Sequence, residues 1–305
     1  MNNSRSGNAL TRFLGYLNWL VNPVHGLSTS QVYDLIGMAS PTGNALYLNL
    51  GYWPAARDVD EASEALALLV AATGSMGAAD TVLDCGFGFG DQDLLWAERC
   101  GPAKIIGLNT TASQVRVARQ RVVDAGLAGR VDLREGSATR MPIDDASIDL
   151  VVALESAFHF DTREDFFAEA FRVLVPGGRL VTADIIPTPQ AAGSIQRFRQ
   201  RLSWYLVASR FNIPDENAYG IEAYERKLQL SGYEAMSVRS IREDVYAPLH
   251  EFLAANPAFL RRQHPLARLL ARATLMRPAA SVYAGLDYVI GYAAKPGARE
   301  GSTAE

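Results

Sequence analysis

Three glycines alternate with aromatic residues in the segment 84–90, which reads Asp-Cys-Gly-Phe-Gly-Phe-Gly. An apolar stretch before it predicts a buried strand and the residues after it predict a helix, so the glycines occupy a strand-to-helix turn. Glycine suits such a turn because a Cβ would keep a ligand away from the backbone. The segment matches neither a phosphate-binding loop nor the dinucleotide fingerprint, and Asp84 and Asp91 would repel a pyrophosphate. It therefore predicts a ligand site that does not hold a polyphosphate.

A carboxylate and an imidazole follow a second apolar run, residues 148–154. Glu155 and His159 are four residues apart and would face the same way if the chain turns helically there. The ordinary pKa of histidine suits His159 to take a proton from a hydroxyl near neutral pH, with Glu155 as an orienting or second catalytic group. A structural histidine bonded to a backbone carbonyl is the alternative.

Strands and helices alternate between residues 80 and 184, which predicts an α/β fold with a mostly parallel sheet. In such a sheet a ligand binds at the carboxyl ends of the strands. Segment 111–126 is expected to be a helix in which Thr111 and Gln114 form a capping box. The expected strands are 81–85, 104–108, 131–134, 148–154, 179–184, 238–241 and 287–294. The other expected helices are 91–100, 162–174, 195–211, 218–230, 247–253 and 257–275.

Composition narrows the class of protein. The chain has 305 residues, 49% of them hydrophobic, and a formal net charge of −4. This charge disfavours nucleic acid as a partner. Two cysteines, Cys85 and Cys100, and four histidines indicate a reduced, cytoplasmic protein with neither a disulfide framework nor a metal site. Residues 9–21 predict a short amphipathic helix packed on the domain, or a membrane-surface anchor, but no stable membrane insertion.

Several short motifs occur together in a fixed order. They are the glycine segment 84–90, Gly-Leu-Asn at 107–109, Glu-Gly-Ser-Ala at 135–138, Met-Pro at 141–142 and Leu-Val-Pro-Gly-Gly at 174–178. Through them the chain resembles the class I S-adenosylmethionine methyltransferases. Tyr-Leu-Asn-Leu-Gly-Tyr-Trp at 47–53, Gly-Asp-Gln-Asp at 90–93, Glu-Ser-Ala-Phe-His at 155–159 and Asp-Ile-Ile-Pro at 184–187 bring it closer to natural-product methyltransferases such as the sugar O-methyltransferases.

The resemblance implies S-adenosyl-L-methionine as cofactor and a set of residues that contact it. Asn109 stands where relatives usually have an acid for the ribose hydroxyls, and Ser137 where many have Asp for the adenine amino group; each could instead be an ordinary turn residue. Aromatic residues at 47–53 would lie over the cofactor, or would pack the N-terminal helices against the sheet. The expected contacts are Tyr47, Tyr52, Asp84, Gly86, Gly88, Gly90, Gln92, Asn109, Thr110, Ser137, Ala138 and Glu155.

The order of the expected elements and the resemblance together imply the domain organisation. The fold is expected to be a Rossmann-like class I methyltransferase sheet, mostly parallel with an antiparallel edge strand, plus N-terminal helices and a helical cap. The expected units are an N-terminal helical segment and cofactor lid (1–78), the cofactor-binding core (79–187), a cap with acceptor-binding insertions and the sixth strand (188–282), the final strand (283–296) and a disordered tail (297–305).

The cap is rich in arginine and aromatic residues. The arginines are read as a solvated helix face, with a clamp for an anionic acceptor as the alternative. The aromatic residues are read as core, or as the wall of an acceptor pocket. The basic residues are Arg197, Arg199, Arg201, Arg210, Arg261, Arg262, His264, Arg268 and Arg272, and the aromatic ones are Trp204, Tyr205, Phe211, Phe252 and Phe259.

The resemblance implies methylation of a small-molecule acceptor in secondary metabolism, with a hydroxyl as the leading acceptor group. Carbon methylation of an alkene such as a prenyl diphosphate is the alternative within the same chemistry. An NAD(P)-dependent reductase and a protein that binds the cofactor without catalysis are the rivals from other classes. A homodimer is left open.

Overall fold

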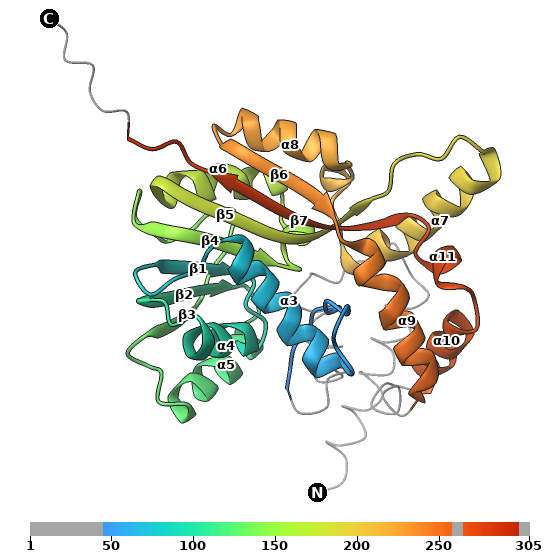
Figure 1. The fold of residues 1–305 in the computed structure, drawn as a ribbon, viewed down its shortest axis with the longest axis horizontal. Coiled ribbons are helices and arrows are strands. Elements are labelled where there is room, and N and C mark those ends of the chain that lie inside the picture. Colours follow the sequence, from blue (N-terminus) through green and yellow to red (C-terminus); the bar gives the residue numbers. More distant parts are fainter. Residues whose placement is uncertain (1–44, 258–264, 299–305) are drawn as a thin grey trace, which may run out of the picture.

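The computed structural model describes residues 45–257 and 265–298, which form one seven-stranded sheet flanked by helices (Figure 1). The strand order is β3-β2-β1-β4-β5-β7-β6. The strands are β1 (Thr81–Cys85), β2 (Lys104–Asn109), β3 (Val131–Glu135), β4 (Ile148–Leu154), β5 (Leu174–Pro187), β6 (Glu234–Ser240) and β7 (Leu286–Ala294). The mostly parallel α/β sheet predicted from the alternating pattern is confirmed.

The first five strands are parallel, and β7 runs antiparallel to β5 and β6, between which it lies. β1 pairs with β2 on one side and with β4 on the other. The chain order reverses at this point, so the connections leaving β1 and β4 go to opposite sides and leave a crevice at their carboxyl ends.

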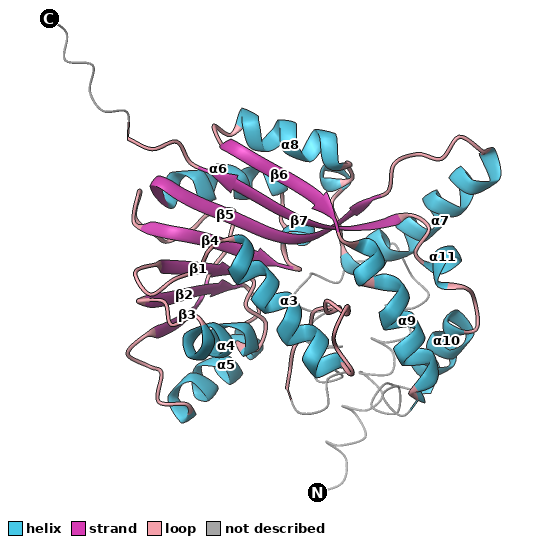
Figure 2. Ribbon diagram, viewed as in Figure 1, coloured by secondary structure: helices cyan, strands magenta, loops and turns pink. Residues whose placement is uncertain are grey.

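Helices cover both faces of the sheet (Figure 2). The apolar residues of α3 (Val59–Thr73), α4 (Asp91–Arg99) and α5 (Ala112–Asp124) pack in one core cluster with alternate residues of the strands. The apolar residues of α6 (Arg163–Val173) and α8 (Ile221–Leu230) pack on the opposite face of the sheet. They contact the strand residues that lie between those of the first cluster. This alternation follows from the two-residue period of a strand.

The remaining helices gather at one end of the sheet, on the right of Figure 1. They are α7 (Ser194–Phe211), α9 (Tyr246–Ala255), α10 (Pro265–Leu275) and α11 (Ala279–Val282), with short 3-10 turns at Ala157–His159, Asp215–Asn217 and Arg242–Asp244. The expected helix 257–275 is described only from Pro265 onward. The expected N-terminal helix and almost all of the expected tail lie outside the described residues. Within the described ranges, no helix is long and apolar enough to cross a bilayer.

One predicted helix start is wrong in its detail. Helix α5 follows Thr111 as expected, but the Thr111 side chain makes no capping hydrogen bond. Gln114 instead accepts a hydrogen bond from the Asn109 side chain at 2.9 Å, which takes it out of reach of a capping box. The capping box that the structure does contain joins Thr162 and Asp165 at the start of α6.

Candidate active site

A cavity of about 260 Å³ lies at the carboxyl ends of β1, β2 and β4, and we call it the main cavity. It occupies the crevice that the reversal of strand order creates. Its walls come from the segment before α3, the glycine segment, the ends of β2 and β4, the start of α5, and the loop after β3. Five segments far apart in the sequence therefore meet at one place.

The first two glycines of the glycine segment have different roles. Gly86 has φ +99°, and a Cβ on it would lie 2.4 Å from the Cβ of Ser156, so its absence lets the ends of β1 and β4 meet. Ser156 closes the same contact by donating a hydrogen bond to the Cys85 carbonyl at 2.5 Å. Gly88 has φ +56° and borders the main cavity, where a Cβ would meet only Leu48, at 3.4 Å. A side chain on Gly88 would therefore take space from an occupant.

Asp84 does not reach the main cavity. Its carboxylate is completely buried and accepts a hydrogen bond from the Gln92 amide at 2.9 Å, while Gln92 itself lines the cavity. The carboxyl of Asp93, also fully buried, lies next to that of Asp84. Burial raises the pKa of Asp84 to about 7 and raises that of Asp93 well above its ordinary value.

The end of β2 carries amide side chains, and one of them, Asn109, stands where relatives usually have an acid. Asn109 donates to Gln114 Oε1 and accepts from the Thr111 backbone N–H at 2.9 Å. Gln114 is 3% exposed and lines the main cavity, and its Nε2 has no hydrogen-bond partner among the described residues. A buried amide donor without a partner costs free energy unless a ligand accepts from it. Gln114 is thus a candidate binding residue that the sequence reasoning missed.

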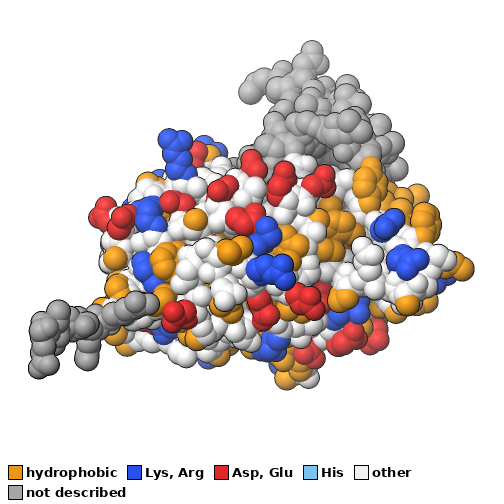
Figure 3. Space-filling model, turned by 90° about the horizontal axis from the view of Figure 1, so that it is seen from above, with side chains coloured by type: hydrophobic (Ala, Val, Ile, Leu, Met, Phe, Trp, Pro, Cys, Tyr) orange, Lys and Arg blue, Asp and Glu red, His pale blue; other side chains and the backbone are white. Residues whose placement is uncertain are grey.

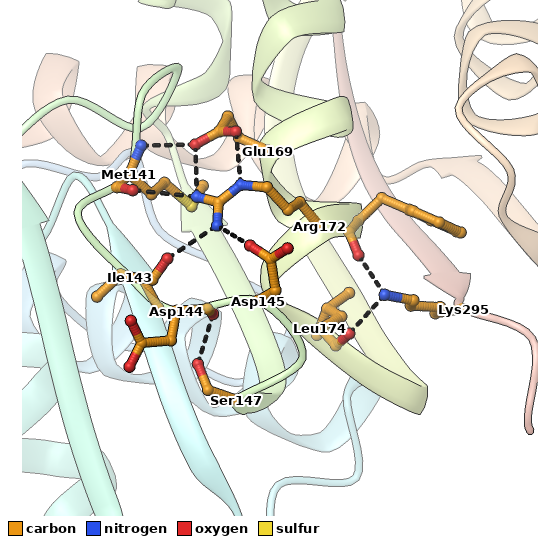
Figure 4. Close-up of polar contacts among 10 residues, drawn as sticks. Met141, Ile143, Asp144, Asp145, Ser147, Glu169, Arg172, Leu174 and Lys295 are labelled. Carbon is orange, nitrogen blue, oxygen red and sulfur yellow. Dashed lines mark hydrogen bonds and ion pairs between the residues drawn. The ribbon is translucent and has the colours of Figure 1, made fainter.

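Ser137 and Ala138 line the main cavity on the loop between β3 and β4. Arg172 of α6 holds this loop (Figure 4). Its guanidinium donates to the carbonyls of Met141 and Ile143 at 3.0 and 2.9 Å, and Glu169 accepts from the Met141 N–H at 2.7 Å. The loop is therefore fixed to α6 by charged hydrogen bonds a few residues from the cavity wall.

The segment before α3 closes the other side of the cavity. Tyr47 is buried and lines it together with Leu46, Leu48 and Asn49. Tyr52 packs against the core beneath α3, and Trp53 packs on Phe252 of α9 with ring centroids 5.2 Å apart. Among the aromatic residues of this segment, Tyr47 is placed to meet a cavity occupant, Tyr52 packs on the core, and Trp53 connects the segment to α9.

Glu155 lies at the end of β4 with φ +50°, which is uncommon for a residue with a side chain. Its Oε1 accepts hydrogen bonds from the Leu50 N–H at 2.6 Å and from the Tyr288 hydroxyl at 2.7 Å, and its side chain lines the main cavity. Burial raises its pKa to about 7, because the two hydrogen bonds only partly offset the loss of water. A carboxyl with that pKa can accept a proton near neutral pH.

His159 lines the same cavity, although no hydrogen bond joins it to Glu155 among the described residues. Its ring packs on Phe158, with centroids 4.0 Å apart, and it has a hydrogen bond with the backbone of Phe211. Burial lowers the pKa of His159 to about 3, far below the ordinary value on which its expected role depended. The imidazole is therefore neutral across the physiological range and a weak proton acceptor.

A buried ion pair positions the turn that carries His159. Arg163 and Asp184 are fully buried and pair at 2.9 Å, and Arg163 also donates to the Asn217 carbonyl at 2.8 Å. The Asn217 amide in turn donates to the carbonyls of Phe158 and Phe160 at 3.1 and 2.8 Å. The start of α6, the end of β5 and the first turn after α7 are thereby locked around the cavity wall.

The structure brings most of the predicted site residues to one cavity. Tyr52, Asp84 and Gly90 do not line it; Gly90 packs against Leu133 and Ala118, where a Cβ would lie within 3.3 Å of each. The predicted residues at the cavity are Tyr47, Gly86, Gly88, Gln92, Asn109, Thr110, Ser137, Ala138, Glu155 and His159. Lining residues without a predicted role include Leu48, Phe89, Thr111, Gln114, Thr139 and Phe160. None of the described cap arginines lines it.

Comparisons with known proteins agree with this geometry. A family described as a methyltransferase domain matches residues 83–182. The erythromycin 3''-O-methyltransferase of Saccharopolyspora erythraea is 35% identical over 267 residues, covering 84% of this chain and 86% of the relative. Among solved structures, the cyclase SpnF aligns with a TM-score of 0.68 and 24% identity, covering 88% of this chain and 97% of that one.

The geranyl diphosphate C-methyltransferase of Streptomyces coelicolor aligns with a TM-score of 0.67 at 17% identity, over 89% of this chain and 100% of that one, and its structure contains S-adenosyl-L-homocysteine. Because the sequence identities are below 25%, both structural similarities support the fold alone. The open space at Gly88 and the partnerless Gln114 amide fit a nucleoside in the main cavity. The similarity to the erythromycin enzyme extends over most of both chains. It shows that this chain belongs to the S-adenosylmethionine-dependent methyltransferases.

Proposed function

We propose that this enzyme methylates a hydroxyl of a natural product, with Glu155 as the general base. The observation that carries the proposal is the position of the Glu155 carboxyl, which lies on the wall of the main cavity with a pKa of about 7. The relation to an enzyme named for 3''-O-methylation of erythromycin supports oxygen as the acceptor atom.

The cofactor supplies an electrophilic methyl group on a sulfonium, a good leaving group for displacement. The chain must align the acceptor oxygen with that methyl and remove the hydroxyl proton. Glu155 takes the proton, and both hydrogen bonds to its Oε1 come from groups that fix its direction, the Leu50 N–H and the Tyr288 hydroxyl. The products are a methyl ether and S-adenosylhomocysteine.

We infer that the remaining groups hold the two reactants. Gly88 gives the cofactor room against the backbone, while Gln114 and Asn109 offer amide groups at the end of β2 in place of the usual acid. Tyr47 closes the cavity from the segment before α3. His159, neutral and packed on Phe158, forms a wall on the acceptor side rather than a base.

The test is product analysis with isotopically labelled cofactor. The enzyme is incubated with methyl-labelled S-adenosylmethionine and a panel of glycosylated polyketides, and products are examined by mass spectrometry and NMR. A labelled methyl ether on one acceptor supports the proposal, and Glu155→Gln should slow its formation roughly a hundredfold or more. Label attached to carbon, for example with geranyl diphosphate as acceptor, would favour carbon methylation instead.

A further inference from the structure

Helix α7 carries an apolar stripe that faces away from the protein. Its members are spaced three and four residues apart and so share one face of the helix. Their side chains are between 38% and 72% exposed. We call this set the α7 stripe: Ile195, Phe198, Leu202, Tyr205 and Leu206.

The α7 stripe is not needed to attach the helix to the fold. The opposite face of α7 packs on the core through Trp204, Val207, Ala208 and Phe211. Ser203 on that side donates to the Val282 carbonyl of α11 at 2.7 Å. The helix is thus anchored by one face and offers a second apolar face to the outside.

Arginines border the stripe on both edges. At 100° per residue, Arg199 and Arg210 fall on one side of it and Arg201 falls on the other. Figure 3 shows apolar side chains interspersed with Lys and Arg at the right-hand end of the molecule, where α7 lies. This combination is typical of helices that lie in the plane of a membrane surface.

Helix α10, on the same side of the molecule as α7 (Figure 1), repeats the pattern. Helix α10 leads directly into α11, and its neighbourhood exposes Leu269, Leu270 and Met276, the last at 87%. Arg268, Arg272 and Arg277 accompany them. Figure 1 shows α7, α11 and α10 along the same side of the molecule.

Charge is segregated between this side and the rest of the chain. The described segments 188–213 and 265–286 of this side contain seven arginines and no acidic residue. An anionic surface would attract this side and repel the remainder, which would orient the molecule.

We propose that α7 and α10 dock the enzyme on an anionic phospholipid bilayer. The stripe residues would sit at the boundary of the acyl chains while the arginines reach lipid phosphates on both edges. A bilayer fits better than an acidic protein because the arginines border the stripe on both sides of a helix that projects from the body of the molecule, as Figure 1 shows. The last residue of α7, Phe211, has its ring 6.2 Å from that of His159, so docking would bring the main cavity close to an acceptor dissolved in the membrane.

Vesicle flotation tests the proposal. The full chain is mixed with phosphatidylcholine vesicles, or with vesicles in which phosphatidylglycerol replaces a third of that lipid, at low and at high salt. The wild-type chain should float with the anionic vesicles, about tenfold less with neutral ones, and less at high salt. Phe198→Ser with Leu202→Ser, and separately Arg199→Glu with Arg201→Glu, should each reduce flotation about tenfold or more.

Matched controls distinguish binding through the α7 stripe from non-specific adsorption of exposed side chains to the vesicles. Val123→Ser with Leu230→Ser removes apolar side chains that are 58% and 80% exposed on α5 and α8, and Arg116→Glu reverses an exposed charge on α5. These should float as the wild type does, and unchanged S-adenosylhomocysteine binding shows that every variant is folded. Two results overturn the proposal: no flotation of the wild type, or equal losses in the controls. A dimer that Phe198→Ser with Leu202→Ser dissociates, without vesicle binding, would assign the stripe to self-association instead.

Discussion

Two ionisable residues on one cavity wall have their pKa values shifted in opposite directions by the same cause. Burial penalises the charged form, which is the anion for Glu155 and the cation for His159. The pKa of Glu155 accordingly rises to about 7 and that of His159 falls to about 3. Near neutral pH the carboxyl can gain or lose a proton while the imidazole carries no charge, so the carboxyl is the better proton acceptor.

The pH dependence of turnover separates these two residues. With a hydroxyl acceptor, kcat/KM should rise as the pH increases through about 7, because Glu155 must lose its proton before it can act. Glu155→Gln should lower kcat roughly a hundredfold or more and remove that rise. His159→Ala should keep the rise and change mainly the acceptor KM. A His159→Ala profile that is flat, beside a normal profile for Glu155→Gln, would make the imidazole the base.

Binding of the cofactor should depend on Gln114. Gln114→Leu keeps the approximate size of the side chain but removes the amide donor that faces the main cavity without a partner. Titration calorimetry with S-adenosylhomocysteine should show roughly tenfold weaker binding, the value of about one hydrogen bond to a buried donor. Gln120→Leu, on the exposed side of the same helix, is the matched control and should bind normally. Equal affinity in wild type and Gln114→Leu would show that the amide does not contact the cofactor.

The role of Gln114 illustrates what could be foreseen at single residues. Gln114 follows Thr111 by three, a spacing that predicts a capping box from local sequence alone. Its actual partner is Asn109, at the end of the preceding strand, and its second amide atom faces a cavity built by five segments. The glycines and Glu155 could be placed because strand ends are visible in the sequence, whereas a shifted pKa depends on burial by distant residues.

At the scale of elements, buried strands were the most predictable and the cap the least. The limits of β4 were predicted correctly because residues 148–154 are apolar on both faces and end in polar residues. The position of β7 between β5 and β6 depends on pairing between segments about a hundred residues apart, which local pattern does not reveal. The helix predicted from residue 218 begins at Ile221, since Asn217 is turned inward to the Arg163 network.

That network should account for much of the stability of the junction between α6, β5 and the cap. Arg163→Met leaves the Asp184 carboxylate buried without its ion-pair partner, so the free energy of unfolding should fall by about 3–5 kcal/mol. Urea unfolding followed by circular dichroism measures this change. Arg116→Met, at an exposed position, should stay within about 0.5 kcal/mol of the wild type. A loss for Arg163→Met as small as that of the control would mean that the buried pair contributes no net stability.

Across the whole molecule, buried carboxyls set how stability responds to pH. Three acids have raised pKa values: the fully buried Asp84, at about 7, and Asp93, well above its ordinary value, and the cavity-lining Glu155, at about 7. Between pH 4 and 7 the unfolded chain releases these protons while the folded chain retains them. The unfolded state therefore binds fewer protons, and the free energy of unfolding falls as the pH rises through this window.

Thermal unfolding across this window, without cofactor, should accordingly show a Tm that declines from about pH 5 toward pH 8. Each retained proton contributes up to about 1.4 kcal/mol per pH unit. Asp93→Asn removes one of them while an amide N–H can still donate to the Asp84 carboxylate, so the decline should be shallower and the Tm at pH 8 higher by roughly 3 °C or more. Asp124→Asn, at an exposed position on α5, should reproduce the wild-type curve. A wild-type Tm that climbs between pH 5 and pH 8, or an Asp93→Asn curve parallel to it, would show that the Asp84–Asp93 pair does not retain its proton on folding.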